Sequence, residues 1–302
     1  MSTLNKKLKI FSILTTIGMI IVLLQGALVT KTDSGQGCGD SWPLCHGQVI
    51  PESISTAETI IEYSHRFVSG ILGLMVIILA IWMWRKFSHI RETKFLSIIA
   101  ILFIVFQGLL GAAAVMWGQS SAVLALHFGF SLISFASVLL LTILVFEEDK
   151  GPKIRTPRMK KGLRGFIYFI FTYLYIVVYT GALVRHTGSS LACAGWPLCN
   201  GQVIPQLQSS IAVQFGHRVA AGLMFLIILA LAIYVYNYYK EESAFRYTTF
   251  ISLFLVTAQV LSGAYVVFTA MSLFSAMLHA FLITCLFGAI SYLVMLATRS
   301  KQ

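Results

Sequence analysis

Eight long runs of apolar residues dominate this sequence. Each is about 20 residues long, which lets a helix cross roughly 30 Å of hydrocarbon. Hydrophobic residues fill 58% of the 302 positions and charged residues only 11%, more apolar surface than a soluble core can bury. The runs lie near residues 10–29, 66–84, 95–116, 122–146, 164–184, 212–236, 246–269 and 273–297. They predict an all-α integral membrane protein with eight transmembrane helices.

Lys and Arg are concentrated on alternate connections between these runs. Because positively charged loops stay in the cytoplasm, this asymmetry predicts a multi-pass protein of the cell membrane with both termini cytoplasmic. The outer loops hold only Lys31 and Arg185, with Arg66 and Arg218 at helix edges. The net charge of +11 therefore reflects topology. Nucleic acid is not an expected partner, since no basic stretch is interleaved with stacking aromatics on a soluble domain.

The chain repeats itself. Cys38-Gly-Asp-Ser-Trp-Pro-Leu-Cys45 returns as Cys193-Ala-Gly-Trp-Pro-Leu-Cys199. Four further pairs are spaced by 152 residues: His65 and His217, Gln107 and Gln259, Gly111 and Gly263, and His127 and His279. We therefore expect two tandem four-helix bundles related by a pseudo-two-fold axis along the membrane normal. The expected bounds are 1–146 for the first bundle, 147–163 for a basic cytoplasmic linker and 164–302 for the second bundle.

Each outer loop carries one cysteine pair, Cys38 with Cys45 and Cys193 with Cys199. The expected compartment is oxidising and the rings are short and rich in turn formers, which favours a structural disulfide in each loop. A redox-active dithiol is the alternative. Zinc binding is disfavoured because the spacing is wider than usual for such sites. Cys285, deep in the last run, is expected to be a small buried apolar residue.

Four of the seven histidines occupy repeat-matched sites inside the membrane: His65, His127, His217 and His279. Ionisable residues are costly there and are functional candidates. In each half the two histidines are expected at one depth, within roughly 10 Å of the outer surface. Facing imidazoles with no thiolate or carboxylate cluster suit the axial positions of a haem. The other three histidines, His46, His89 and His186, are expected to be solvated.

Arginines follow two of these histidines directly. Arg66 and Arg218 lie towards the outer surface, where a guanidinium can pair with a haem propionate. Extension of the side chain to the membrane interface is an equally good interpretation. Arg185 is a third candidate for a propionate contact.

The halves differ at one position of chemical interest. Glu62 precedes His65 by three residues and shares its helix face, whereas Gln214 occupies the matching place in the second half. A carboxylate there can be hydrated or paired with Arg66, or it can act as a base or stabilise a developing cation. The difference suggests that one half performs chemistry on the porphyrin it binds, while the other keeps a permanent haem for electron transfer.

Together, these residues resemble the Bacillus-type haem A synthases over about residues 10–297. The resemblance rests on the duplicated Trp-Pro-Leu-Cys loops, on Glu62-Tyr-Ser-His65-Arg66 and Gln214-Phe-Gly-His217-Arg218, and on His127 and His279. It implies oxidation of the C8 methyl group of haem O to a formyl group through hydroxylated intermediates, giving haem A for terminal oxidases. It places the substrate haem between His65 and His127, haem b between His217 and His279, and the catalytic carboxylate at Glu62.

Two other classes of function remain open at this point. The four histidines would also serve a non-catalytic di-haem protein for electron transfer or haem transport. The loop cysteines would suit a membrane thiol oxidase that uses a quinone. The expected partners are the lipid bilayer, a synthase that supplies haem O, an oxidase that accepts haem A, an electron acceptor that the sequence does not specify, and a further copy of this chain in a homo-oligomer.

Overall fold

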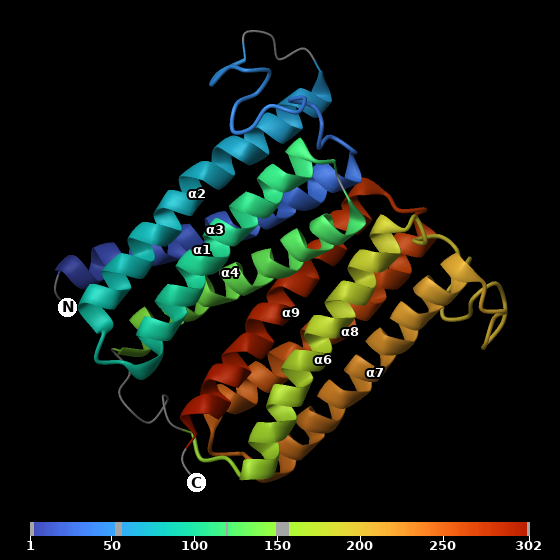
Figure 1. The fold of residues 1–302 in the computed structure, drawn as a ribbon. Coiled ribbons are helices and arrows are strands. Elements are labelled where there is room, and N and C mark those ends of the chain that lie inside the picture. The colour runs from blue at the N-terminus through green and yellow to red at the C-terminus, as the bar shows by residue number, and fades with distance from the viewer. Residues whose placement is uncertain (1–2, 52–55, 119, 149–156, 301–302) are drawn as a thin grey trace. The chain divides into compact units, whose positions relative to one another are not determined.

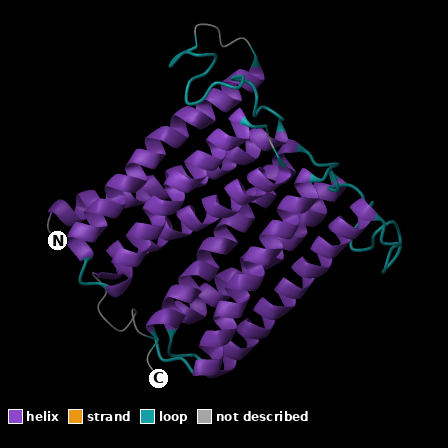
Figure 2. Ribbon diagram, in the orientation of Figure 1, coloured by secondary structure: helices purple, strands orange, loops and turns teal. Residues whose placement is uncertain are grey.

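The computed structural model describes residues 3–51, 56–118, 120–148 and 157–300. In these residues the long elements are eight α-helices, and each is long and apolar enough to cross a membrane (Figures 1 and 2). The prediction of an all-α protein with eight transmembrane helices is confirmed.

The chain divides into two compact units, unit 1 at Met1–Phe146 and unit 2 at Glu147–Gln302. The helices of unit 1 are α1 (Thr3–Lys31), α2 (Ala57–Phe87), α3 (Arg91–Met116) and α4 (Ser121–Glu147), whose last residue falls beyond the boundary. Those of unit 2 are α6 (Lys161–His186), α7 (Ser209–Tyr238), α8 (Ser243–Phe268) and α9 (Leu273–Arg299). Each unit therefore has four spanning helices.

Apolar side chains and a few hydroxyls hold each unit together. In unit 1 the hydroxyls of Thr16 and Thr142 lie 2.8 Å apart and tie α1 to α4. In unit 2 the fully buried ring of Phe287 on α9 packs against Tyr175 of α6. A hydrogen bond in hydrocarbon has no competing water, so such pairs fix the register of neighbouring helices.

Helix α2 begins well before the apolar run that predicts it. The run starts at residue 66, whereas the helix starts at Ala57, after Thr56, whose hydroxyl accepts the N–H of Thr59 at 3.2 Å. Hydropathy marks where contact with lipid begins, but the N-cap marks where the helix begins. Glu62 and His65 consequently lie inside a regular helix.

The predicted linker at 147–163 falls partly outside the described residues, which omit 149–156. At its far end the structure differs from the prediction, because α6 begins at Lys161 and so takes in the last three linker residues. Helix formation there needs no lipid contact, so hydropathy again places the start too late.

A long connection separates the first two helices of each unit, 32–56 in unit 1, of which 52–55 lie outside the described residues, and 187–208 in unit 2. The two loops share a backbone ring. The N–H of Cys45 donates to the carbonyl of Gln48 at 2.9 Å, and the N–H of Cys199 donates to that of Gln202 at 3.0 Å. We call them the Cys loops. The sequence repeat is therefore a repeat of local structure.

Candidate haem sites and the Cys loops

The four repeat-matched histidines occupy equivalent helix positions. His65 is the ninth residue of α2 and His217 the ninth of α7; His127 is the seventh residue of α4 and His279 the seventh of α9. Within each unit the two imidazoles lie near each other. The structure thus brings His65 together with His127, and His217 together with His279.

Each of these imidazoles lies against a glycine on the preceding helix. A Cβ added at the glycine would lie 3.0 to 3.5 Å from the Cε1 atom of the ring. The pairs are Gly26 with His65, Gly111 with His127, Gly181 with His217, and Gly263 with His279. The missing side chains let the helices approach and leave room for each ring, which is a use of small residues common in membranes.

The chemistry of the donor set fits a haem. Each unit offers two imidazoles from two helices, in an apolar bundle that suits the macrocycle. In the described residues, His, Cys, Asp and Glu form no group of three or more that could hold a bare metal ion. Buried Nδ1 atoms of His65 and His127 have no hydrogen-bond partner there either. Among the described residues each pair of imidazoles lacks the third protein ligand that a zinc site needs, but it matches the two axial positions of a porphyrin iron.

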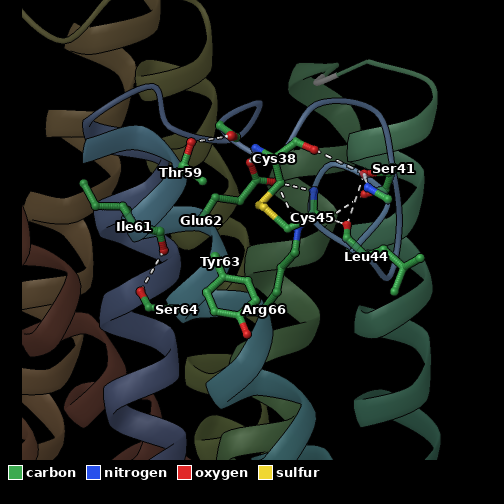
Figure 3. The surroundings of a disulfide bond; sticks show 12 residues. Cys38, Ser41, Leu44, Cys45, Thr59, Ile61, Glu62, Tyr63, Ser64 and Arg66 are labelled. Atoms are coloured by element: carbon green, nitrogen blue, oxygen red, sulfur yellow. Dashed lines mark hydrogen bonds and ion pairs between the residues drawn. A yellow bond between two sulfur atoms is a disulfide. The ribbon is translucent and has the colours of Figure 1, made fainter. Parts of the chain in front are cut away.

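Glu62 lies beneath the Cys loop of unit 1 and is almost fully buried (Figure 3). Its Oε2 atom accepts the N–H of Cys38 at 2.8 Å. Its Oε1 atom accepts Nε of Arg66 at 3.0 Å and also pairs with Nη2 of Arg66. The carboxylate therefore links the helix to the loop through an ion pair with Arg66 and a hydrogen bond from the Cys38 backbone.

Arg66 extends this link to the loop itself. Its Nη1 atom donates to the carbonyl of Ser41 at 2.6 Å and to that of Leu44 at 2.7 Å (Figure 3). Four donor contacts thus use most of the guanidinium. The arrangement fixes the loop that contains the Cys38–Cys45 disulfide above the histidine pair.

Unit 2 builds the same link without the carboxylate. Oε1 of Gln214 accepts the N–H of Cys193 at 2.5 Å, and its Nε2 donates to the carbonyl of Ser190 at 2.5 Å. Arg218 donates to the loop carbonyls of Gly195 and Leu198 at 2.9 and 3.2 Å, and to that of Cys193 at 3.0 Å. An amide is enough to anchor the loop, so anchoring does not explain why unit 1 carries a charge.

Both loop disulfides form, Cys38–Cys45 and Cys193–Cys199, each with its Cα atoms 4.6 Å apart. All four cysteines are at most 1% exposed. Cys285 is a free thiol on α9 with intermediate exposure, less buried than predicted. The burial of the disulfides agrees with a structural role for them.

The structure gives two of the arginines a contact that the sequence did not predict. Arg66 and Arg218 donate hydrogen bonds to loop carbonyls, which neither the propionate interpretation nor the membrane-interface interpretation includes. Arg185 stands in the last turn of α6. The signal for the loop contacts is present in the repeat, since each arginine is paired with a Cys loop of the same sequence pattern.

Comparison with known proteins agrees with these features. The sequence profile of the family described as "Cytochrome oxidase assembly protein" matches residues 9–291. A protein of Halalkalibacterium halodurans named "Heme A synthase" is 53% identical over 298 residues, covering 99% of each chain. One of the same name from Geobacillus kaustophilus is 54% identical over 299 residues, covering 99% of this chain and 94% of its own. The chain thus belongs to the cytochrome oxidase assembly protein family, among relatives named haem A synthase.

Proposed function

We propose that this chain is a haem A synthase that oxidises the C8 methyl group of haem O to a formyl group. The observation that carries the proposal is a charge difference between two matched positions: Glu62 in unit 1 against Gln214 in unit 2, both buried and both bonded to a Cys loop. Unit 1 is the proposed substrate site and unit 2 the proposed site of haem b.

The histidines divide between these roles. His65 and His127 would hold the iron of the substrate haem, and His217 and His279 that of haem b. Haem b would supply electron-transfer chemistry when bound. The names of the relatives support the product, haem A.

Glu62 is the proposed catalytic carboxylate. In the folded protein both its oxygens are occupied by donors from Arg66 and Cys38. A fixed anion in a low-dielectric site stabilises positive charge that develops nearby, at no cost in reorganisation. To act as a base, Glu62 would take up the proton at the second lone pair of Oε2, the first of which accepts the Cys38 N–H.

The apolar nature of both haems supports transfer through the membrane. We propose that haem O is delivered by the synthase that makes it and haem A is passed to an oxidase, with a separate electron acceptor, as the membrane location of the eight helices permits.

The test is Glu62→Gln, which places the unit 2 residue in unit 1. Gln214 shows that an amide can accept the loop N–H, so the Cys loop should remain anchored. Haems are extracted from membranes that also produce haem O and are identified by chromatography. We expect haem b to stay bound and haem A to disappear.

Gln214→Glu is the matched control and should leave haem A formation unchanged. Undiminished haem A from the Glu62→Gln protein would contradict the proposal. A non-catalytic di-haem carrier, the alternative function, predicts no haem A from either the unchanged protein or the Glu62→Gln protein.

A further inference from the structure

Two hydroxyl groups distinguish the histidines of unit 2 from those of unit 1. The Oγ1 atom of Thr180 lies 2.8 Å from Nδ1 of His217, and the Oγ atom of Ser262 lies 2.8 Å from Nδ1 of His279. Each hydroxyl residue directly precedes the glycine that faces the same ring, Gly181 or Gly263. In each case the hydroxyl residue contacts Nδ1 of the ring, and the glycine that follows it lies against the Cε1 atom of the same ring.

The direction of these hydrogen bonds follows from the other bond that each hydroxyl makes. Thr180 donates its only hydroxyl hydrogen to the carbonyl of Val177 at 2.7 Å, and Ser262 donates to the carbonyl of Gln259 at 2.8 Å. Each oxygen must then accept from the histidine. His217 and His279 consequently carry their proton on Nδ1, which leaves the Nε2 lone pair for iron.

The amide of Gln259 agrees with this tautomer. Its Nε2 atom lies 3.1 Å from Nε2 of His279 and 3.2 Å from Nδ1. Because Nδ1 is a donor to Ser262, the ring atom able to accept from the amide is Nε2. The amide has to leave that atom for the nitrogen to bind iron, so Gln259 is a contact of the haem-free ring.

Unit 1 has no hydroxyl at either place. Gln25 precedes Gly26 where Thr180 precedes Gly181, and Leu110 precedes Gly111 where Ser262 precedes Gly263. Among the described residues, buried Nδ1 atoms of His65 and His127 and the Oε1 atom of Gln25 make no hydrogen bond. The backbone carbonyl of Gln107 lies near the His127 ring, as that of Gln259 lies near the His279 ring, so both units share this neighbour. What unit 1 lacks is a hydroxyl at Nδ1 of either ring.

Helix packing differs in the same sense. In unit 2, α8 and α9 pack backbone to backbone along their length, more extensively than any other pair of helices. In unit 1 the corresponding helices, α3 and α4, approach each other only weakly at the backbone. Helix α4 contacts α3 through side chains such as the rings of Phe103 and Phe130, and its backbone lies farther from α3 than the backbone of α9 lies from α8.

We propose that Thr180 and Ser262 are positioning residues that lock the imidazoles of His217 and His279 for permanent haem binding, and that Gln25 and Leu110 leave the imidazoles of unit 1 free to release a haem after reaction. The inference rests on the proposed function in placing the resident haem b in unit 2 and an exchanging haem in unit 1.

The physical basis is the partner that a ligating histidine needs on its second nitrogen. A hydrogen-bond acceptor at Nδ1–H fixes the tautomer, orients the ring and makes Nε2 a stronger donor, and losing it costs about 10- to 100-fold in metal affinity. A product that must leave is better served by ligands without this support. The hydroxyl partners of unit 2 thus suit a haem that stays bound, and their lack in unit 1 suits a haem that is released after reaction.

The test compares Thr180→Val and Ser262→Ala with the hydroxyl-retaining Thr180→Ser and Ser262→Thr. Purified haem-loaded protein in lipid nanodiscs is mixed with excess apomyoglobin, and transfer of haem b is followed by absorption. Without the hydroxyl, haem b should leave about 10- to 100-fold faster. Its midpoint potential should rise, because a less basic imidazole stabilises ferric iron less.

The retained-hydroxyl variants should keep the wild-type rate and potential. Unchanged rate and potential in Thr180→Val and Ser262→Ala would overturn the inference. If those variants bind no haem b, Thr180→Ser and Ser262→Thr decide: haem retention supports the role of the hydroxyl, and loss shows that side-chain shape was responsible and overturns it.

The reciprocal protein, Gln25→Thr with Leu110→Ser, tests unit 1. It should retain haem A after turnover, seen as a higher ratio of haem A to protein after purification. An unchanged ratio would overturn the unit 1 half of the inference. Because the haem b measurements need no haem A formation, they remain valid if Glu62→Gln shows that the proposed function is wrong.

Discussion

The carboxylate of Glu62 accepts the backbone N–H of Cys38 at 2.8 Å, which joins the helix that carries His65 to the disulfide loop above it. Gln214 and Cys193 make the equivalent bond in unit 2. In each unit a side chain of the helix that carries the first histidine therefore anchors the Cys loop. In unit 1 that side chain is a carboxylate, and in unit 2 it is an amide.

Arg66 compensates that charge, so its removal should destabilise the protein. Arg66→Met leaves Glu62 buried without its ion-pair partner, a situation that costs about 3–5 kcal/mol. Arg218→Met is the matched control, since Gln214 is neutral and only hydrogen bonds to the loop are lost. Thermal unfolding in detergent should show a larger loss of stability for Arg66→Met. Equal losses would show that the Glu62 charge is not held by Arg66.

Gly181 should be intolerant of any side chain. A Cβ there would lie 3.0 Å from Cε1 of His217, closer than nearly all real contacts, so Gly181→Ala should turn the ring and lower the amount of bound haem b. Gly222→Ala, also in a membrane helix of unit 2, meets nothing within 4 Å and is the control. The ratio of haem b to protein and the low-spin absorption bands measure the effect. A full complement of haem b in Gly181→Ala would contradict the expected crowding.

The disulfides should contribute stability rather than redox chemistry. Replacing Cys38 and Cys45 together by Ser removes a short closed ring, worth about 2–3 kcal/mol, while the Glu62 and Arg66 contacts still anchor the loop. The variant should unfold at lower temperature yet still form haem A below that temperature. Replacing Cys193 and Cys199 should act likewise. A stable variant that makes no haem A would instead support the dithiol interpretation.

The basic residues predict which side of the membrane each loop faces. Segments rich in Lys and Arg stay cytoplasmic, so a fluorescent protein fused to the C-terminus should fluoresce. Alkaline phosphatase fused within the Cys loop of unit 1 should be active, because that enzyme needs an oxidising compartment. The reverse pattern would invert the predicted topology.

Most of the fold could be read from hydropathy, and most of the site from the repeat. The position of His127 relative to His65 follows from helix length and depth alone, since both elements are regular. The start of α2 could not be found in this way, because the helix extends beyond the apolar run to its cap at Thr56.

The contacts of Arg66 and the hydroxyl partner of His217 also lay beyond sequence reasoning. They depend on how loop carbonyls fold back and on the angle between α6 and α7, which no periodicity encodes. The difference between Thr180 and Gln25 is visible in the aligned halves. Its meaning becomes clear only once the distance to Nδ1 of His217 is known.

The most direct test of unequal units is to identify the haems that His217→Ala and His65→Ala retain. Each protein is purified, offered haem O, and its haems are extracted and separated by chromatography. The account predicts that His217→Ala lacks haem b but still takes up haem O, whereas His65→Ala keeps haem b and does not hold haem O. The opposite assignment, with haem b lost from His65→Ala and kept in His217→Ala, would contradict it.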